Sequence, residues 1–186
     1  MSKAKNEPGA GVALSAKAGA PGPEPWLRGT HDDVSAVPRA VLHALELAGE
    51  DIEKWCGGLS DEELNAVPQG LAAVAFHLRH IARSIDRLLT YAEGRDLNAA
   101  QVAALKSEMA AGATHADVFE EVKQGLESGC LRVRAIRASG LEAFRSVGKK
   151  QLPTSVGGLL VHIADHTQRH VGQAVITAKV LLDERK

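Results

Sequence analysis

Histidines are the residues in this sequence best suited to chemistry, because imidazole exchanges protons near neutral pH and binds transition metals. The sequence holds eight of them, at His31, His43, His77, His80, His115, His162, His166 and His170. Of these, His162, His166 and His170 follow one another at steps of four residues. On a helix, a step of four turns the chain by about 40°, so the three side chains line one stripe. A pair of imidazoles at this spacing can hold one divalent ion.

A third ligand must come from another helix, and the segment around residue 80 offers two candidates. His77 and His80 are three residues apart, so both lie near one face of a helix. In helical projection, His80, His166 and His170 lie at the edge of the apolar face of their helices, whereas His77 lies nearer its centre. Spacing alone therefore leaves the choice between His77 and His80 open.

Two polar residues near these histidines are candidates to orient an imidazole or a bound water. Ser84 lies one helical turn beyond His80, and Gln173 lies close to one turn beyond His170. The catalytic glutamate of the H-E-x-x-H motif is absent. Because no Glu-x-x-His occurs in the sequence either, we exclude a di-iron carboxylate site. The metal hypothesis therefore depends on histidines alone.

Apolar residues at helical spacing predict four long helices that would carry the histidines. We expect these helices at about residues 31–56, 71–93, 115–139 and 154–182. Ser60 and Glu63 predict a capping box for one short helical turn, and Asn98 and Gln101 predict caps for a further helix through residue 111. No segment of useful length alternates with period two, and no hairpin signal such as Asn-Gly is present. We therefore expect no strands.

Four amphipathic helices in one small chain predict an all-α fold, a four-helix bundle. The connection between the second and third helices is about twenty residues long and carries its own short helix. This length permits a long crossover between helices 2 and 3 in place of a simple up-down order. Residues 1–25 hold four of the seven prolines and show no periodicity, so we predict a disordered Pro/Gly/Ala-rich tail. Residues 26–186 then form one domain.

Composition excludes several classes of protein. The chain has 186 residues, 45% hydrophobic and 3% aromatic, which is enough for a core of Ala, Leu, Val and Ile. Its 22 basic and 23 acidic residues give a net charge of −1, so we expect no nucleic-acid or membrane partner. The longest stretches free of charge reach about fourteen residues, whereas a membrane span needs about 20. No signal peptide is recognisable, and Cys56 and Cys130 predict reduced thiols in a cytoplasmic protein.

Two segments of the sequence, 76–82 and 166–173, together resemble the DinB-like superfamily. In that family, a histidine of the second helix that is followed by Ile/Leu-Ala is joined by an H-x-x-x-H motif on the fourth helix. The second motif typically continues as His-Arg-Gly-Gln, and here it reads His170-Val171-Gly172-Gln173. The resemblance extends from about Trp26 to Lys186. Each motif alone is weak, but both in this order and at this separation are fairly specific.

The resemblance implies His80, His166 and His170 as ligands of a divalent zinc, nickel or iron ion. It selects His80 over His77 because His80 is the residue followed by Ile-Ala. His77 and His162, with the Ser84 and Gln173 side chains named above, then become pocket residues or supports of the ligands. The family fold is a four-helix bundle with a long crossover, often dimeric, so we expect a homodimer.

The function implied by the resemblance is a metal-dependent transferase that acts on a small molecule with a low-molecular-weight thiol as cosubstrate. Three neutral imidazoles leave coordination positions open, where water or a thiol can be activated. Two alternatives remain, because the sequence offers no convincing general base. One is a metal-dependent hydrolase, and the other is a non-catalytic metal-binding or dimerising helical module.

Several charged residues receive simpler interpretations. Arg79, Arg83 and Arg87 follow one another at steps of four beside the predicted site. We interpret them as a solvated helix face, with an acidic cosubstrate or a partner subunit as the alternative. His43 lies opposite the apolar stripe of its helix and is expected to be exposed, and His31 has no partner that the sequence identifies.

Overall fold

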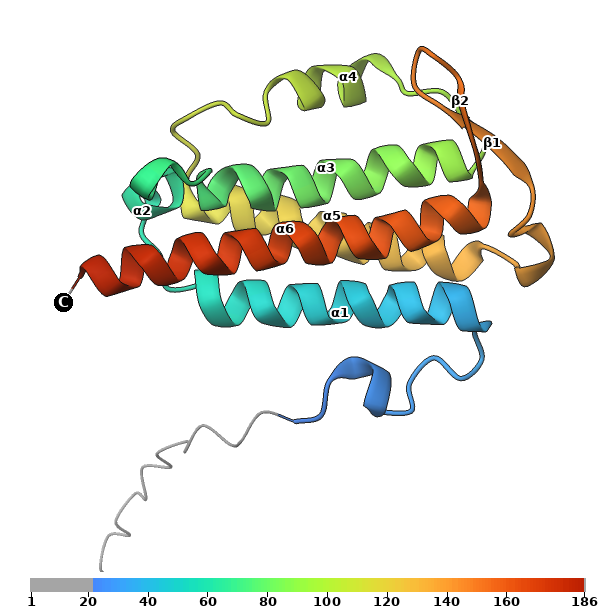
Figure 1. Cartoon of the computed structure of the whole chain (residues 1–186), viewed down its shortest axis with the longest axis horizontal. Coiled ribbons are helices and arrows are strands. Elements are labelled where there is room, and N and C mark those ends of the chain that lie inside the picture. Colours follow the sequence, from blue (N-terminus) through green and yellow to red (C-terminus); the bar gives the residue numbers. More distant parts are fainter. Residues whose placement is uncertain (1–21, 186) are drawn as a thin grey trace, which may run out of the picture.

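A computed structural model describes residues 22–185, and it is mostly helical, as predicted (Figure 1). The long helices are α1 (Ala36–Cys56), α3 (Val74–Ala92), α5 (His115–Ala135) and α6 (Val156–Glu184). The shorter elements are α2 (Asp61–Asn65), α4 (Ala99–Lys106), β1 (Phe144–Val147) and β2 (Leu152–Ser155). Most of the predicted N-terminal tail, residues 1–21, lies outside the described residues. Within the described range, no helix combines the length and apolar character that crossing a bilayer requires.

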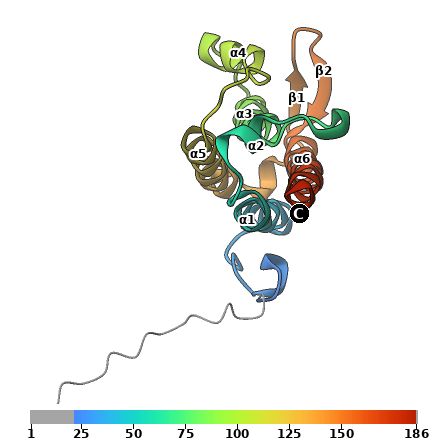
Figure 2. The same ribbon diagram turned by 90° about the vertical axis from the view of Figure 1, so that its left-hand side faces the viewer.

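The four long helices surround one apolar core. Figure 2 shows these helices nearly end-on. Helix α6 packs against α1 and α3, and α5 packs against α3 and α1. Apolar residues recur three and four positions apart in each helix, so their side chains gather on the inward face. Fully buried members of the core include Leu42, Leu45, Leu78, Ile81, Ile85, Leu160 and Ile163.

Capping side chains set where several helices begin. The predicted capping boxes at Ser60 with Glu63 and at Asn98 with Gln101 are both present. Each satisfies backbone N–H groups that a helix start leaves unpaired, an effect typically worth about 1 kcal/mol. The first long helix begins at residue 36, not 31, because His31 has φ 58°, outside the right-handed helical region.

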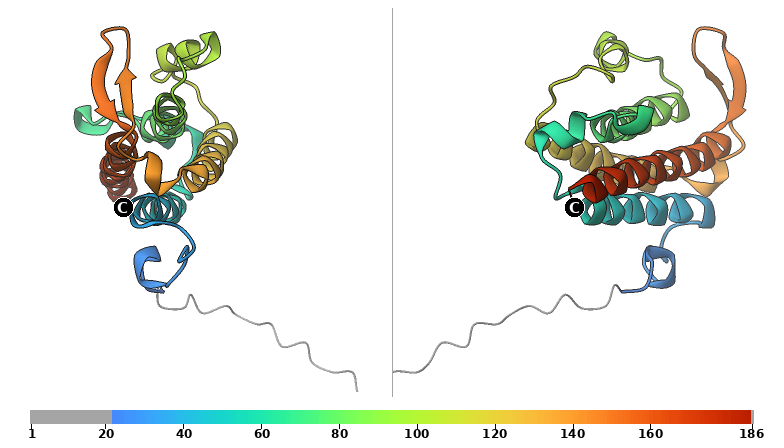
Figure 3. Two further views of the ribbon diagram at one scale, coloured as in Figure 1. Left: turned by 90° about the vertical axis from the view of Figure 1, so that its right-hand side faces the viewer. Right: turned by 60° about the vertical axis from the view of Figure 1, so that its left-hand side comes forward.

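A two-stranded hairpin corrects the expectation that the chain has no strands. Strand β1 pairs antiparallel with β2, with Phe144 opposite Ser155. Four residues per strand are too few to show an alternating pattern. The turn between them uses Gly148 (φ +70°) and Gln151 (φ 50°) and no Asn-Gly pair. The hairpin and α4 project from the same side of the long helices (Figure 3).

The connection that carries α4 lies along α3 (Figure 1). Arginine side chains of α3 bind this connection. Arg79 donates to the Ala110 carbonyl at 3.0 Å, and Arg83 donates to the Ala104 carbonyl at 2.7 Å. The side chains of Arg79, Arg83 and Arg87 are only 11–15% exposed. The interpretation of these arginines as a solvated face is therefore wrong, because the connection covers them.

Two glycines allow α5 to lie unusually close to α3. A Cβ added at Gly125 would stand 2.7 Å from the Ala82 Cβ and 2.8 Å from its Cα. A Cβ added at Gly129 would stand 2.7 Å from Ile85 Cγ2. These glycines therefore mark a close contact between α5 and α3, which we call the glycine seam. Helix α5 itself stays regular through both positions.

We predict that Gly125→Ala destabilises the fold, because the added methyl group forces α5 away from the α3 backbone. Overpacking of this kind typically costs about 1–3 kcal/mol. Gly172→Ala on α6 is the matched control, since nothing lies within 4 Å of its Cβ position. An exposed helical Gly→Ala change is expected to stabilise by roughly 0.5–1 kcal/mol. Urea unfolding followed by circular dichroism measures the stability of both variants. Equal unfolding midpoints for Gly125→Ala and wild type would contradict the close contact between α5 and α3 at the glycine seam.

Candidate metal centre

The packing of α3 against α6 brings three of the predicted site histidines together. His80, His166 and His170 each offer a ligand atom, and these atoms all lie within 4.8 Å of one another. The centroids of their rings are 4.4–4.9 Å apart. All three side chains are partly buried. The geometry thus forms a compact group of imidazoles contributed by two helices.

A buried carboxylate fixes the orientation of His80. The Nδ1–H group of His80 donates to Glu108 Oε2 at 2.7 Å, and Arg87 donates to the other oxygen of Glu108 at 2.5 Å. The ring of Phe76 stacks on the His80 ring with centroids 5.5 Å apart. With its proton on Nδ1, a neutral His80 presents a lone pair on Nε2. Carboxylates commonly orient metal-binding histidines in this way.

A hydroxyl group has the same effect on His166. Ser84 Oγ donates to the Ile81 carbonyl at 3.1 Å and lies 3.4 Å from His166 Nδ1, so its remaining lone pair can accept the Nδ1 proton. His166 then also presents a lone pair on Nε2. The Nε2 atoms of His80 and His166 are 3.2 Å apart. Two imidazole nitrogens bound to one tetrahedral zinc ion would stand roughly 3.4 Å apart.

His77 lies behind His170 and outside the group of candidate ligand atoms. Their Nδ1 atoms are 3.0 Å apart, and the His77 side chain is buried. When His170 donates this hydrogen bond, its Nε2 atom keeps a lone pair for a metal. Spacing left the choice between His77 and His80 open, whereas the structure groups His80 with the α6 histidines and places His77 beside His170.

The remaining predicted site residues lie at the periphery. His162 is exposed, with its ring centroid 5.3 Å from that of His166. Gln173 is exposed as well, and no hydrogen bond joins its side chain to a histidine in the described chain. His162 therefore borders the group, while the expected orienting role of Gln173 has no contact to support it.

Glu108 is the site residue that sequence reasoning missed. It lies 28 residues from His80, in the connection after α4, where no periodic pattern fixes its position. Its side chain is only 5% exposed. The one signal that could have pointed to it is the arginine series on α3, since arginines covered by a connection require acceptors within it.

The environment keeps His77, His166 and His170 neutral by lowering the pKa of each imidazole. Burial, followed by the charge of neighbouring histidines, lowers the pKa of His77 and His166 to about 4. Burial and the neighbouring His80 lower the pKa of His170 to about 4. Neutral imidazole is the form that binds a metal ion. His166 and His170 are therefore in their ligating form at neutral pH.

A second group, His31, His43 and Glu46, also places three ligand atoms within 4.8 Å. Arg134 donates to His31 Nδ1 at 2.7 Å, so the His31 proton is on Nε2, where it is donated to Glu46 at 2.5 Å. That proton and the neighbouring guanidinium oppose cation binding. The group instead links α1, α5 and the segment before α1. The structure thus gives His31 the partners that the sequence did not identify, Glu46 and Arg134. His43 is partly buried, so the expectation that it is exposed is wrong.

The lowered histidine pKa values predict a pH-dependent stability of the metal-free protein. In the unfolded chain His77, His166 and His170 bind protons below about pH 6.5, whereas in the folded protein they bind protons only near pH 4. The unfolded state therefore binds more protons in this window, so stability falls as pH is lowered from 6.5 to 4. Urea midpoints across this range measure the slope. The variant His77→Gln/His166→Gln/His170→Gln is expected to flatten it, and an equal slope in this variant would contradict the assignment.

Comparisons with known proteins agree with this architecture. A family model described as the DinB superfamily matches residues 44–174, which include all three grouped histidines. The chain is also similar to a conserved protein of Enterococcus faecalis, known from a crystal structure. That likeness has a TM-score of 0.66 and 18% identity over 81% of this chain and 99% of the other. At this identity it shows the fold alone.

No curated protein matches the sequence at a significant level. The family model nevertheless spans well over half of the chain, from the middle of α1 to the later half of α6. The match includes residues of all four long helices. The chain belongs to the DinB superfamily.

Proposed function

We propose that this protein binds one divalent metal ion through His80, His166 and His170. The observation that carries the proposal is the pair of Nε2 atoms 3.2 Å apart, one on each helix. Glu108 and Ser84 can accept the Nδ1 protons of His80 and His166, and two lone pairs then face each other across this gap. Such lone pairs repel unless a cation or a proton lies near both.

The three imidazole nitrogens limit which metal ions the site would bind. Neutral imidazoles suit zinc, nickel and iron, whereas magnesium and calcium prefer oxygen ligands. A set of three protein ligands is typical of catalytic sites, which keep a position for water or substrate. When bound, such an ion supplies Lewis acidity and lowers the pKa of a coordinated thiol or water.

We further propose that the centre serves a transferase reaction on a small molecule, with a low-molecular-weight thiol as cosubstrate. Glu108, the carboxylate in contact with a proposed ligand, is already bound by His80 and Arg87. It is therefore not free to accept a proton from a substrate. A thiol suits this centre because coordination makes it nucleophilic without a separate base. His162, exposed beside His166, would line its approach.

Elemental analysis of protein purified without an affinity tag or chelator tests metal binding. We expect about one equivalent of zinc, nickel or iron per chain, as in a mononuclear site. The variant His166→Ala/His170→Ala should lose the metal while its helical circular dichroism persists. His43→Ala, a histidine outside the group, is the control and should retain it. Absence of metal from the wild type, even after reconstitution, would overturn the proposal.

Metal-binding constants, measured by competition with a chelator, distinguish the ligands from the residues that orient them. His80→Ala should abolish binding, whereas His77→Ala and Glu108→Gln should weaken it by roughly 10–100-fold, as loss of a supporting residue typically does. Glu121→Gln is the matched control, because Glu121 also pairs with an arginine of α3. Among the described residues, no ion pair or hydrogen bond joins Glu121 to a histidine. Retention of metal in His80→Ala with loss in His77→Ala would reassign the third ligand.

Cobalt-substituted protein tests whether the centre accepts a thiol. Addition of L-cysteine is expected to produce a thiolate-to-cobalt charge-transfer band in the near ultraviolet, whereas L-serine should not. A spectrum that responds to pH but not to thiol would favour the hydrolase. A spectrum that responds to neither would indicate a structural metal in a non-catalytic module.

A further inference from the structure

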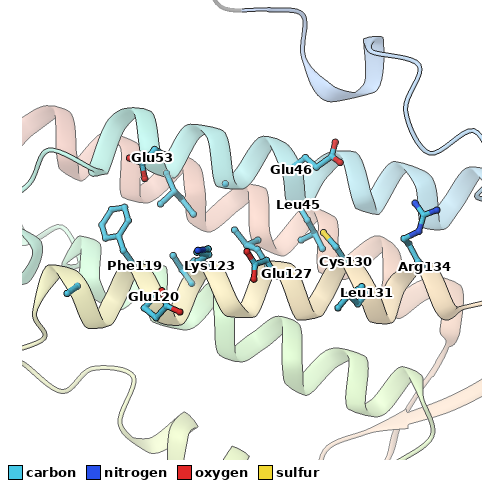
Figure 4. A pocket seen from close by; sticks show the side chains of 15 residues that line it. Leu45, Glu46, Glu53, Phe119, Glu120, Lys123, Glu127, Cys130, Leu131 and Arg134 are labelled. Carbon is cyan, nitrogen blue, oxygen red and sulfur yellow. The ribbon is translucent and has the colours of Figure 1, made fainter.

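A long groove runs between α1 and α5, helices that contribute no histidine to the candidate metal centre (Figure 4). Its volume is about 960 Å³, and every residue that lines it belongs to one of these two helices. Apolar side chains form most of the lining, among them Leu45, Ile52, Phe119, Val122 and Leu126. The groove is therefore a separate feature that the proposed function leaves unused.

Carboxylates dominate the rim of this groove. Glu53 of α1 lines it together with Glu120 and Glu127 of α5, and Lys123 is the one cation beside them in the lining away from the Arg134 end. Figure 4 shows these charged side chains along the length of α5 and at one end of α1. Three carboxylates against one ammonium group leave this part of the rim net negative.

At the other end of the groove, the charged side chains are bound to one another. Glu46 and Arg134 line it, and His31 joins them by accepting from Arg134 and donating to Glu46. Negative potential extends to the thiol of Cys130 in the lining, whose pKa is raised to about 11 by burial and by Glu46 and Glu127. The rim carboxylates that remain to attract a cation are therefore those farther from Arg134.

The size of the groove suits a small molecule. Its volume lies within the range of roughly 300–1,000 Å³ that is typical of small-molecule sites. An apolar floor between two helices suits an elongated apolar body, and the rim suits a positive charge at its end.

We propose that the groove between α1 and α5 binds an elongated apolar small molecule with a cationic head group, which Glu53, Glu120 and Glu127 attract. The apolar body lies along the floor, where its burial supplies most of the affinity. The carboxylates act mainly in selection, because they attract a cation and repel an anion of the same shape. Binding here does not depend on a metal at the histidine centre.

Calorimetric titration of the full chain with two matched amphiphiles tests this proposal. The probes are decyltrimethylammonium and decyl sulfate, both kept below their micellar concentrations. The cation is expected to bind about tenfold more tightly than the anion, given the modest strength of solvent-exposed charge pairs. The cation should also slow alkylation of Cys130, which lines the groove, while Cys56 in the core stays unreactive throughout.

Two pairs of variants locate the binding site. Gly49 lines the groove, so Gly49→Leu should fill it and weaken binding of the cation at least tenfold, whereas Gly172→Leu on α6 should not. Glu120→Gln/Glu127→Gln should remove most of the preference for the cation. The control Glu62→Gln/Glu142→Gln makes the same change of charge outside the lining and should leave the preference unchanged.

Three results would overturn the proposal. The first is that neither probe binds. The second is equal binding of cation and anion, which would show an apolar groove without charge selection. The third is full binding by Gly49→Leu with a native circular dichroism spectrum, which would place the ligand elsewhere. If Gly49→Leu does not fold, protection of Cys130 in the wild type decides whether the cation occupies the groove.

Discussion

The distance between two imidazole nitrogens, one on α3 and one on α6, is the constraint on which the rest of the centre depends. His80 and His166 can share an ion only if the two helices keep both their separation and their register, since one residue of sliding shifts a side chain by about 1.5 Å. Packing of Leu78 and Ile81 in the core with Leu160 and Ile163 provides that precision. Close-packed interiors deform little, so the apolar core and the polar centre are parts of one arrangement.

The connection between α3 and α5 contributes to this centre as much as the long helices do. A buried carboxylate is costly unless its oxygens are paired. Both oxygens of Glu108 are paired, one with His80 and the other with Arg87. Arg79 and Arg83 bind carbonyl groups of the same connection and so fix the backbone on either side of Glu108. The orientation of one imidazole therefore depends on a segment that contains little regular structure.

Local patterns explain what the sequence could predict. The long helices follow from apolar spacing and from capping residues such as Ser60 and Asn98, because these signals lie within one or two turns of the element they define. The pairing of His166 with His170 is local for the same reason. The selection of His80 over His77 came from a family resemblance, since spacing could not fix the rotation of α3 relative to α6. The hairpin could not be predicted, and the arginine series of α3 was the one indirect signal for Glu108, because the positions of both depend on contacts distant in sequence.

The glycine seam has a consequence on the opposite side of α5. Gly125 and Gly129 remove the side chains that would otherwise hold α5 away from α3, so α5 lies against α3 along this face. A rigid helix that moves toward one neighbour moves away from another, and α5 packs less extensively on α1 than on α3. The absence of side chains at Gly125 and Gly129 thus favours a wider space between α1 and α5. Neither glycine lines that space itself.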